Sequence, residues 1–240
     1  MARVLAVLSS GYEEKDYHTG WWAEELFAPL QKLEDAGHTV DLASPFGGKP
    51  EVDVRSISED FDPDGTYKKL YESGRADQTM KLEEVDAENY DVILVVGGHG
   101  AMFDLAKNVD LHALMNKVYD NGGILAAECH GPSVFAFLKG PDDELLIKGL
   151  DVTGYPDEIE PEEVLPFLPY SLEQELREVA NYIPEMDKKA YAVWANDQIV
   201  TSRDPFSSEL MGDELVKKLN KQTKKDCLKA VFFCLFYRDV

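Results

Sequence analysis

A cysteine and a histidine stand side by side in the segment "AAECHGPSVF", which runs from Ala126 to Phe135. The apolar residues before them predict a buried strand, and the glycine and proline after them are typical of a tight turn into a helix. Ligands of parallel α/β sheets gather at the carboxyl ends of strands. A thiol at the positive end of a helix is favoured as thiolate, so the pKa of Cys129 should fall. The segment predicts a nucleophile elbow with cysteine in place of serine. The alternative interpretation is a buried structural cysteine.

A thiolate that attacks a carbonyl group needs hydrogen-bond donors for the oxyanion. The segment "GGHG" (Gly97 to Gly100) ends the buried apolar run that precedes the cysteine strand. Its glycines let backbone N–H groups approach a ligand closely. We therefore expect the N–H groups of Gly98 and His130 to form an oxyanion hole.

A carboxylate would complete the catalytic set, and the predicted helix from Trp21 to Ala36 supplies Glu24 and Glu25. At about 100° per residue, Glu25 falls at the edge of the apolar face, whereas Glu24 points to solvent. A half-buried carboxylate has the raised pKa that suits a general acid or base near neutral pH. Pro29 should kink this helix or end its first part.

The elements that must position these residues alternate between apolar strands and amphipathic helices, which predicts parallel βαβ units and an α/β sheet covered on both faces. A polar segment from Pro50 to about Thr79 reads as a surface insertion with a short helix. The other predicted strands are Arg3 to Ser9, the segments "HTVDLAS", "YDVILVVGGHG" and "LDVTGY", and a hairpin that turns at Asn196 and Asp197; the other predicted helices are Thr66 to Ser73, Leu111 to Tyr119, Pro161 to Leu168, Leu172 to Tyr182 and Ser207 to Leu219.

The composition narrows the class of protein. The chain has 240 residues and a formal net charge of −22, which disfavours nucleic acids and anionic membranes as main partners. Three cysteines in unrelated settings argue for a reducing compartment rather than a disulfide framework. No run of apolar residues is long enough to span a membrane, and the N-terminus lacks the pattern of a signal peptide.

We interpret residues 1–222 as one domain and residues 223–240 as an atypical C-terminal tail. The tail, "TKKDCLKAVFFCLFYRDV" with Cys227 and Cys234, is basic and then strongly apolar. Packing against the body or a partner is the favoured interpretation. Its aspartates and short length disfavour a membrane-surface anchor.

Four segments resemble the ThiJ/PfpI superfamily in order and spacing, and most closely its fungal heat-shock-protein-31-like branch of glutathione-independent glyoxalase III proteins. They are "TGWWAEELFAPL", "VVGGHGAMFDL", "NGGILAAECHGPSVF" and "IKGLDVTGYPDEIEPEE". The resemblance implies a flavodoxin-like sandwich, similar to class I glutamine amidotransferases and usually dimeric. It also implies conversion of methylglyoxal, or of glyoxal, by a D-lactate dehydratase that needs neither metal nor cofactor, in the cytoplasm and in some cases the nucleus.

By position, the resemblance assigns Cys129 as nucleophile, His130 as its partner and Glu25 as the helix glutamate. Glu160 matches the acidic residue that orients the histidine, although Asp157 and Glu158 are close enough in sequence to compete. Glu128 differs from the apolar residue usual in relatives. Strand geometry points its side chain away from the thiol's side, so we expect a hydrogen bond to a hydroxyl, a backbone N–H or a second carboxyl.

Three other functions compete with that of a glyoxalase. A holdase chaperone would bind unfolded protein clients, a deglycase would act on glycated proteins or nucleotides, and a redox sensor would use a reactive thiol. A peptidase is disfavoured, because a Cys-His pair alone does not supply a substrate cleft.

Overall fold

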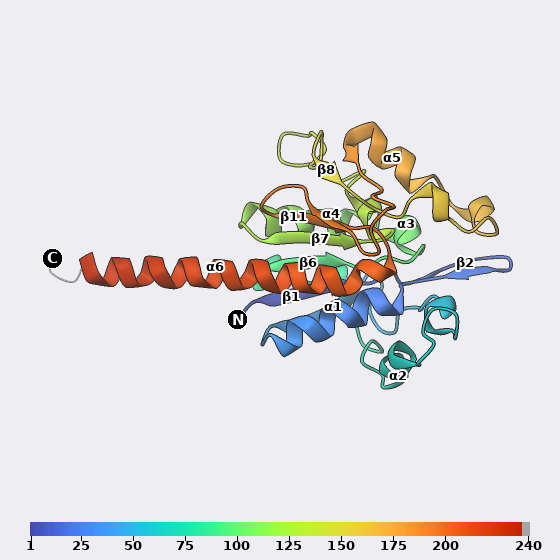
Figure 1. Cartoon of the computed structure of the whole chain (residues 1–240), viewed down its shortest axis with the longest axis horizontal. Helices are drawn as coiled ribbons and strands as arrows, with labels where there is room; N and C mark the ends of the chain where they lie inside the picture. Colours follow the sequence, from blue (N-terminus) through green and yellow to red (C-terminus); the bar gives the residue numbers. More distant parts are fainter. Residues whose placement is uncertain (237–240) are drawn as a thin grey trace.

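The computed structural model describes the backbone of residues 1–236 and the side chains of residues 1–222. A seven-stranded sheet runs through the middle of the described part (Figure 1). Its strands are, in spatial order, β10 (Ala192–Trp194), β11 (Ile199–Ser202), β7 (Ile124–Glu128), β6 (Val92–Val95), β1 (Arg3–Val7), β4 (Thr39–Ser44) and β5 (Met80–Lys81). All neighbours are parallel except β10 and β11, which form the predicted hairpin. The predicted α/β class with a mostly parallel sheet is confirmed.

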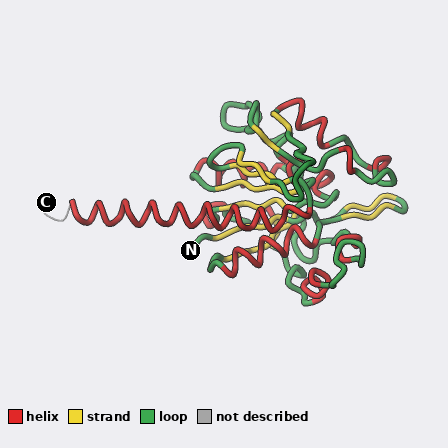
Figure 2. The backbone as a smooth tube through the Cα atoms, viewed as in Figure 1, coloured by secondary structure: helices red, strands yellow, loops and turns green. Residues whose placement is uncertain are grey.

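Helices cover both faces of this sheet, as the red coils around the yellow strands show in Figure 2. The helices α1 (Ala23–Asp35) and α6 (Ser208–Phe236) pack side by side on one face, and α4 (Val109–Asp120) lies on the other. The remaining helices are α2 (Thr66–Glu72), α3 (Ala101–Asp104) and α5 (Leu172–Val179). Two small pairs of strands lie outside the main sheet: β2 (Tyr12–Glu14) with β3 (Tyr17–Thr19), and β8 (Asp151–Val152) with β9 (Asn181–Tyr182).

Alternation along the central strands divides the core into two layers. In β1, Val4 and Ala6 belong to the cluster under α1 and α6, whereas Leu5 and Val7 belong to the cluster on the α4 side. Because successive side chains of a strand point to opposite faces, each buried strand serves both layers. This alternation places the side chain of Glu128, the last residue of β7, on the sheet face that α1 and α6 cover. The chain then turns at Cys129.

The insertion between β4 and β5 is more than a polar surface segment. The predicted short helix is α2, but the stretch before it contributes buried polar residues that hold the body together. Ser56, on the short 3-10 turn η1 (Val54–Ile57), accepts the Ala23 N–H at 3.1 Å and so caps α1 from a distance. The insertion therefore fixes the start of the helix that carries Glu25.

Pro29 does not end α1, which continues to Asp35. The helix packs closely on α6 at this point, since a Cβ on Gly212 would lie 2.9 Å from the Pro29 Cα. This tertiary packing outweighs the backbone hydrogen bond that proline removes.

Two other predicted helices also differ from the structure. The stretch Pro161 to Leu168 forms only the 3-10 turn η6 (Leu165–Phe167), because its two prolines cannot donate backbone hydrogen bonds. The helix from Leu172 ends at Val179, since the next residues pair with β8. The remaining 3-10 turns are η2 (Leu82–Glu84), η3 (Ala87–Asn89), η4 (Gly131–Val134), η5 (Asp157–Ile159) and η7 (Pro205–Ser207).

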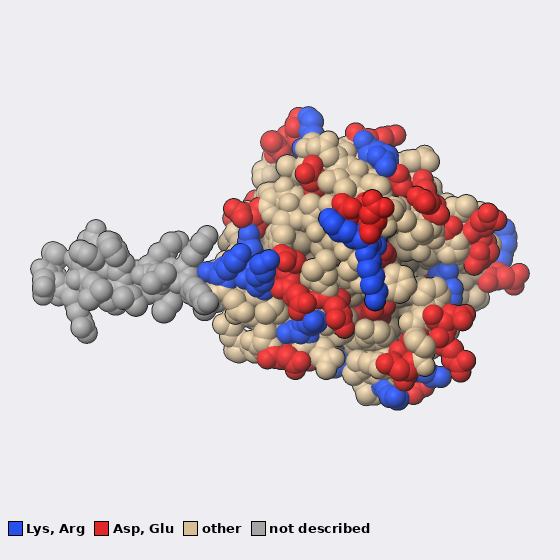
Figure 3. All heavy atoms as spheres, viewed as in Figure 1, with Lys and Arg blue, Asp and Glu red and all other residues tan. Residues whose placement is uncertain are grey.

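The last helix runs well past the predicted end at Leu219. The backbone of α6 continues to Phe236, across the boundary predicted at residue 222, and extends beyond the body in Figures 1 and 2. The side chains of the tail, including Cys227 and Cys234, lie outside the described residues. No helix of the described part is both long and apolar enough to cross a membrane. Figure 3 shows acidic side chains spread over one face of the body, with fewer basic ones among them.

Candidate active site

Cys129 follows β7 directly, and its backbone lies in the left-handed region, with φ of 56°. This conformation is uncommon for a residue with a side chain and needs support from its surroundings. The Cys129 N–H donates to the Ser202 carbonyl at 3.0 Å, and its own carbonyl accepts the Tyr155 N–H at 2.9 Å. The sharp turn predicted for a nucleophile elbow is thus present. The helix after it, however, is only the four-residue turn η4, so its dipole is weaker than we expected.

The imidazole of His130 lies between the thiol and a carboxylate. Cys129 Sγ is 3.3 Å from His130 Nδ1, and His130 Nε2 is 2.8 Å from Glu160 Oε2. Burial alone would raise the pKa of Glu160, but the charge and hydrogen bonds of two imidazoles outweigh it and hold that pKa well below 4.5. Glu160 is therefore an ionised acceptor that can fix the orientation of His130.

The two competing acidic residues lie elsewhere. Asp157 accepts hydrogen bonds from the Ser171 hydroxyl at 2.6 and 2.8 Å, where Ser171 caps α5, and Glu158 is exposed. Of the three candidates, the structure brings only Glu160 to His130.

Glu25 stands in the first turn of α1 and is completely buried, rather than at the half-buried edge we expected. Its Oε2 accepts the Gly97 N–H at 2.8 Å, and its carboxyl group faces the Cys129 thiol. Gly97 makes this approach possible, because a Cβ there would lie 2.4 Å from that oxygen. Burial raises the pKa of Glu25 well above 4.5, against the hydrogen bonds from Cys129 and Gly97.

Glu24 does not point freely into solvent as predicted. Helix α2 of the insertion partly covers it, and its Oε1 accepts a hydrogen bond from the Tyr67 hydroxyl at 3.5 Å. Burial raises its pKa to about 7. The two glutamates differ in their partners, because Glu25 contacts Cys129 whereas Glu24 contacts Tyr67 of the insertion.

The pKa of the Cys129 thiol is raised, which contradicts the lowered pKa predicted from the sequence. Burial is the main cause, and the charge of Glu25 adds to it, while the Gly98 N–H opposes it. The prediction was wrong because only a four-residue turn follows Cys129 and because the thiol residue is 2% exposed. Thiol and carboxyl group form a hydrogen-bonded pair in which a negative charge on one disfavours a negative charge on the other.

One of the two predicted oxyanion donors, the Gly98 N–H, lies at the thiol. Gly98 has a φ of 86°, and a Cβ on it would lie 2.4 Å from the Gly20 carbonyl oxygen, so a glycine is required here. Its N–H is directed at the Cys129 sulfur. Within the described residues neither this N–H nor that of His130 donates to an oxygen atom, so both can serve a bound substrate.

Sequence reasoning missed His99 and Arg55. His99 Nε2 lies 2.6 Å from Glu160 Oε1, and Arg55 Nη2 lies 2.9 Å from His99 Nδ1. Arg55 is held in turn by Asp53, which is 1% exposed. The sequence did contain a signal for His99, because this histidine stands in "GGHG" at the end of a buried strand, but the prediction used only the glycines of that segment. Arg55 offered no signal, because it lies in the insertion.

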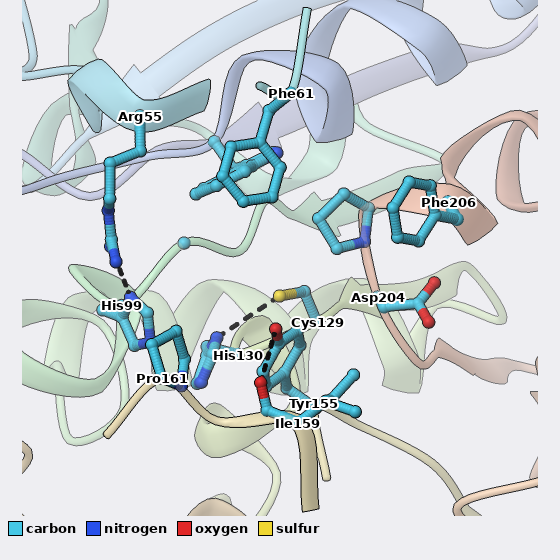
Figure 4. A pocket seen from close by; sticks show the side chains of 13 residues that line it. Arg55, Phe61, His99, Cys129, His130, Tyr155, Ile159, Pro161, Asp204 and Phe206 are labelled. Atoms are coloured by element: carbon cyan, nitrogen blue, oxygen red, sulfur yellow. Dashed lines mark hydrogen bonds between the residues drawn. The ribbon is translucent and has the colours of Figure 1, made fainter. Parts of the chain in front are cut away.

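These residues line a pocket of about 60 Å³ above the thiol (Figure 4). One water molecule needs about 10–15 Å³ of such volume, so the pocket has room for about four to six groups of the size of a water molecule. The inner end is polar, with Cys129 and the two histidines, and Figure 4 shows Phe61 and Phe206 across the pocket from them. The other lining residues are Trp22, Arg55, Gly98, Tyr155, Ile159, Pro161, Asp204 and Pro205. The pocket suits a small substrate with few polar atoms.

One group of side chains in the described part has the composition of a metal site, namely His99, His130 and Glu160, with donor atoms within 4.8 Å of one another. These atoms already bond to each other, because each Glu160 oxygen pairs with one imidazole. A metal ion would have to displace both hydrogen bonds. The geometry fits a hydrogen-bonded relay better than a metal centre.

Glu128 is fully buried on the sheet face that α1 and α6 cover. The Ser202 hydroxyl donates to its Oε2 at 3.2 Å, which is one of the partners we predicted. Burial raises the pKa of Glu128 well above 4.5, and the charge of Glu25 adds to the increase. The position therefore favours the protonated, uncharged form of this carboxyl group.

Comparison with known proteins gives consistent matches. A profile of the DJ-1/PfpI family matches residues 17–218. The chain is 33% identical over 168 residues to Glyoxalase 3 of Candida albicans, covering 65% of this chain and 70% of that protein. It is 33% identical over 165 residues to the glutathione-independent glyoxalase HSP31 of Saccharomyces cerevisiae, covering 65% and 69%. The crystal structure of glyoxalase III from Candida albicans matches with a TM-score of 0.79 and 26% identity, over 90% of this chain and 97% of that one.

Proposed function

The chain belongs to the DJ-1/PfpI family, and from this membership and the site geometry we propose that it is a glutathione-independent glyoxalase that converts methylglyoxal to D-lactate. The observation that carries the proposal is one small pocket in which a buried thiol contacts both an imidazole and a carboxyl group. Relatives at 33% identity are named as glyoxalases.

The first step is addition of Cys129 to the aldehyde carbon. The thiol proton passes to His130 Nδ1, since His130 Nε2 keeps its own proton toward Glu160. A carbon–sulfur bond forms, and the aldehyde oxygen gains the negative charge. The N–H groups of Gly98 and His130 stabilise that oxygen until it is protonated to give a hemithioacetal.

The second step moves a hydrogen from the former aldehyde carbon to the neighbouring ketone carbon. The carbon-bound proton leaves to a base and the ketone oxygen gains a proton, which gives an enediol. The second carbon is then protonated while the hydroxyl on the sulfur-bound carbon gives up its proton and becomes the thioester carbonyl. Glu25 and His130 are the acid and the base of this exchange, because both contact the sulfur of Cys129 and both can carry a proton. The product is a lactoyl thioester on Cys129.

The third step is hydrolysis. Water attacks the thioester carbonyl, the same N–H groups hold the oxyanion, and the thiolate leaves and recovers its proton. Lactate is released, so the net reaction adds one water to methylglyoxal. The apolar mouth formed by Phe61 and Phe206 suits a small dicarbonyl substrate with a methyl group.

The test is turnover of methylglyoxal without glutathione, with the chirality of the lactate determined. We expect D-lactate from the wild type and a loss of about 10³-fold or more in Cys129→Ala, since losing a covalent nucleophile removes the whole pathway. Cys227→Ala is the matched control and should retain full turnover. Residual activity of Cys129→Ala above about a tenth of wild type would reject Cys129 as nucleophile.

The same variant separates the competing functions. A holdase should still suppress aggregation of an unfolded client after Cys129→Ala, whereas a redox sensor should lose its response to peroxide. The raised pKa of Cys129 weighs against fast oxidation, because the thiolate is the form that peroxide attacks.

A further inference from the structure

Glu160 accepts hydrogen bonds from two histidines, not one. His130 contacts Oε2 at 2.8 Å and His99 contacts Oε1 at 2.6 Å. The side chain of Glu160 is 5% exposed, and His130 is the imidazole that contacts the thiol, at 3.3 Å. Both oxygens of this nearly buried carboxylate are thus occupied, each by one imidazole.

The tautomer of His99 follows from its other neighbour. Arg55 Nη2 lies 2.9 Å from His99 Nδ1, and a guanidinium group has donors only. Nδ1 must therefore carry the lone pair, so the ring proton is on Nε2 and points at Glu160. His99 is neutral in this arrangement, and burial, followed by the neighbouring His130, lowers its pKa to about 4.

Arg55 is itself fixed by the insertion. Asp53 accepts from Arg55 Nε at 2.9 Å and from Nη2 at 2.5 Å, and it also accepts the Thr19 hydroxyl at 2.8 Å. Asp53 balances the charge of Arg55, so Glu160 faces a neutral N–H donor on this side rather than a second cation.

We propose that His99 and Arg55 are positioning residues: Arg55 fixes His99 as the Nε2–H tautomer, and His99 then holds Glu160 in the orientation that keeps His130 against Cys129. Without His99, Glu160 Oε1 would lose its partner and the carboxylate could rotate away from His130. The kinetic part of the test below assumes glyoxalase activity, so that part of the inference rests on the proposed function.

The groups that face this relay are neutral or already paired. Tyr17 and Tyr155 lie close to Glu160, and burial raises the pKa of both, that of Tyr17 to about 12. The other groups beside the relay are the Cys129 and Glu25 pair, and Arg55 with Asp53, whose charges offset each other.

The first arm of the test measures the resting enzyme by ¹⁵N NMR of the histidine rings. We expect His99 to show a protonated Nε2 and an unprotonated Nδ1 at pH 7. In Arg55→Met this fixed tautomer should be lost, and in Arg55→Lys, which keeps a donor, it should be retained. A proton on Nδ1 of His99 in the wild type overturns the proposal.

The second arm compares His99→Leu with His99→Gln, whose amide can still donate to Glu160. Loss of a partner that orients a reacting group typically costs about 10- to 100-fold in activity, so kcat of His99→Leu should fall by this amount with KM little changed. The acid limb of its pH profile should move to higher pH, because Glu160 loses a donor. His99→Gln should restore both, and His112→Leu is the histidine control.

Equal losses in His99→Leu and His99→Gln would mean a purely structural role and would overturn the proposal, as would an unchanged kcat in His99→Leu. If the wild type does not turn over methylglyoxal, the proposed function fails by itself. The NMR arm, together with the rate of Cys129 alkylation by iodoacetamide in the same variants, then still decides whether His99 positions Glu160 and His130.

Discussion

Glu25→Gln removes an exchangeable proton while changing almost nothing in shape. The amide oxygen can accept the Gly97 N–H as the carboxylate does at 2.8 Å, and the amide N–H₂ can face the sulfur of Cys129. The site therefore keeps its packing and its hydrogen bond. Only the capacity to take and return a proton is lost.

General acid–base catalysis by one side chain contributes about 10²- to 10⁴-fold, so kcat for methylglyoxal should fall by that factor. This corresponds to about 2.7–5.4 kcal/mol of transition-state stabilisation. The thiol should respond in the opposite direction. Because the charge of Glu25 raises the pKa of Cys129, the variant should be alkylated by iodoacetamide with a lower pH midpoint than the wild type.

Stability provides the folding control. The folded chain holds the Glu25 proton above pH 4.5, where the unfolded chain has released it, so the free energy of unfolding falls as pH rises. The contribution of one such group reaches about 1.4 kcal/mol per pH unit, until pH passes the folded pKa. Urea unfolding of Glu25→Gln should therefore decline less steeply above pH 5 than that of the wild type.

Glu24→Gln is the matched control, because Glu24 is one residue earlier on the same helix and contacts Tyr67 rather than the thiol. Its kcat should stay close to wild type. If the folded Glu25→Gln protein keeps more than about a tenth of wild-type kcat, or if both variants lose activity equally, then Glu25 is not the acid or base.

The other predictions follow from single contacts. Glu160→Gln should lower kcat by about 10- to 100-fold, whereas Asp157→Asn should not, and equal kinetics of the two would contradict the role assigned to Glu160. Glu128→Gln should leave the pH midpoint of Cys129 alkylation unchanged, because burial and the charge of Glu25, not Glu128, raise the pKa of Cys129. It should also make the loss of stability above pH 5 shallower by up to about 1.4 kcal/mol per pH unit. Deleting residues 223–240 should preserve the rate per active site, measured by titrating Cys129, since the pocket is built from residues up to Phe206.

The sheet and the elbow were predictable because they depend on local pattern. The run "ILAAE" is buried along its whole length in β7, and the turn at Cys129 needs only Gly131 and the partners of its own backbone. The phase of one helix correctly ranked Glu25 as more buried than Glu24, although both are more buried than it predicts. Each of these inferences uses residues close together in sequence, where periodicity carries the information.

The parts that sequence reasoning missed depend on contacts between distant segments. His99 and Arg55 meet across 44 positions, and Glu160 reaches His99 across 61. Nothing local marks Arg55 as a partner of the site. The predicted direction of the Cys129 pKa was wrong for the same reason. Burial by several elements raises this pKa more than the dipole of the short turn after Cys129 can lower it. A single sequence states which groups can react but not how deeply they are buried.

A neutral resting thiol is consistent with a histidine that is tied to an ionised carboxylate. Keeping a thiolate and an imidazolium separated from water would carry a large desolvation cost, whereas a neutral thiol beside a neutral imidazole avoids it. The proton then has to leave Cys129 when substrate arrives, and Glu160 stabilises the imidazolium that forms on His130. The raised pKa of Cys129 and the lowered pKa of Glu160 therefore act together to control when the proton leaves the thiol. The raised pKa keeps Cys129 as a thiol before substrate binds. The ionised Glu160 favours proton transfer to His130 once an aldehyde oxygen can take the negative charge.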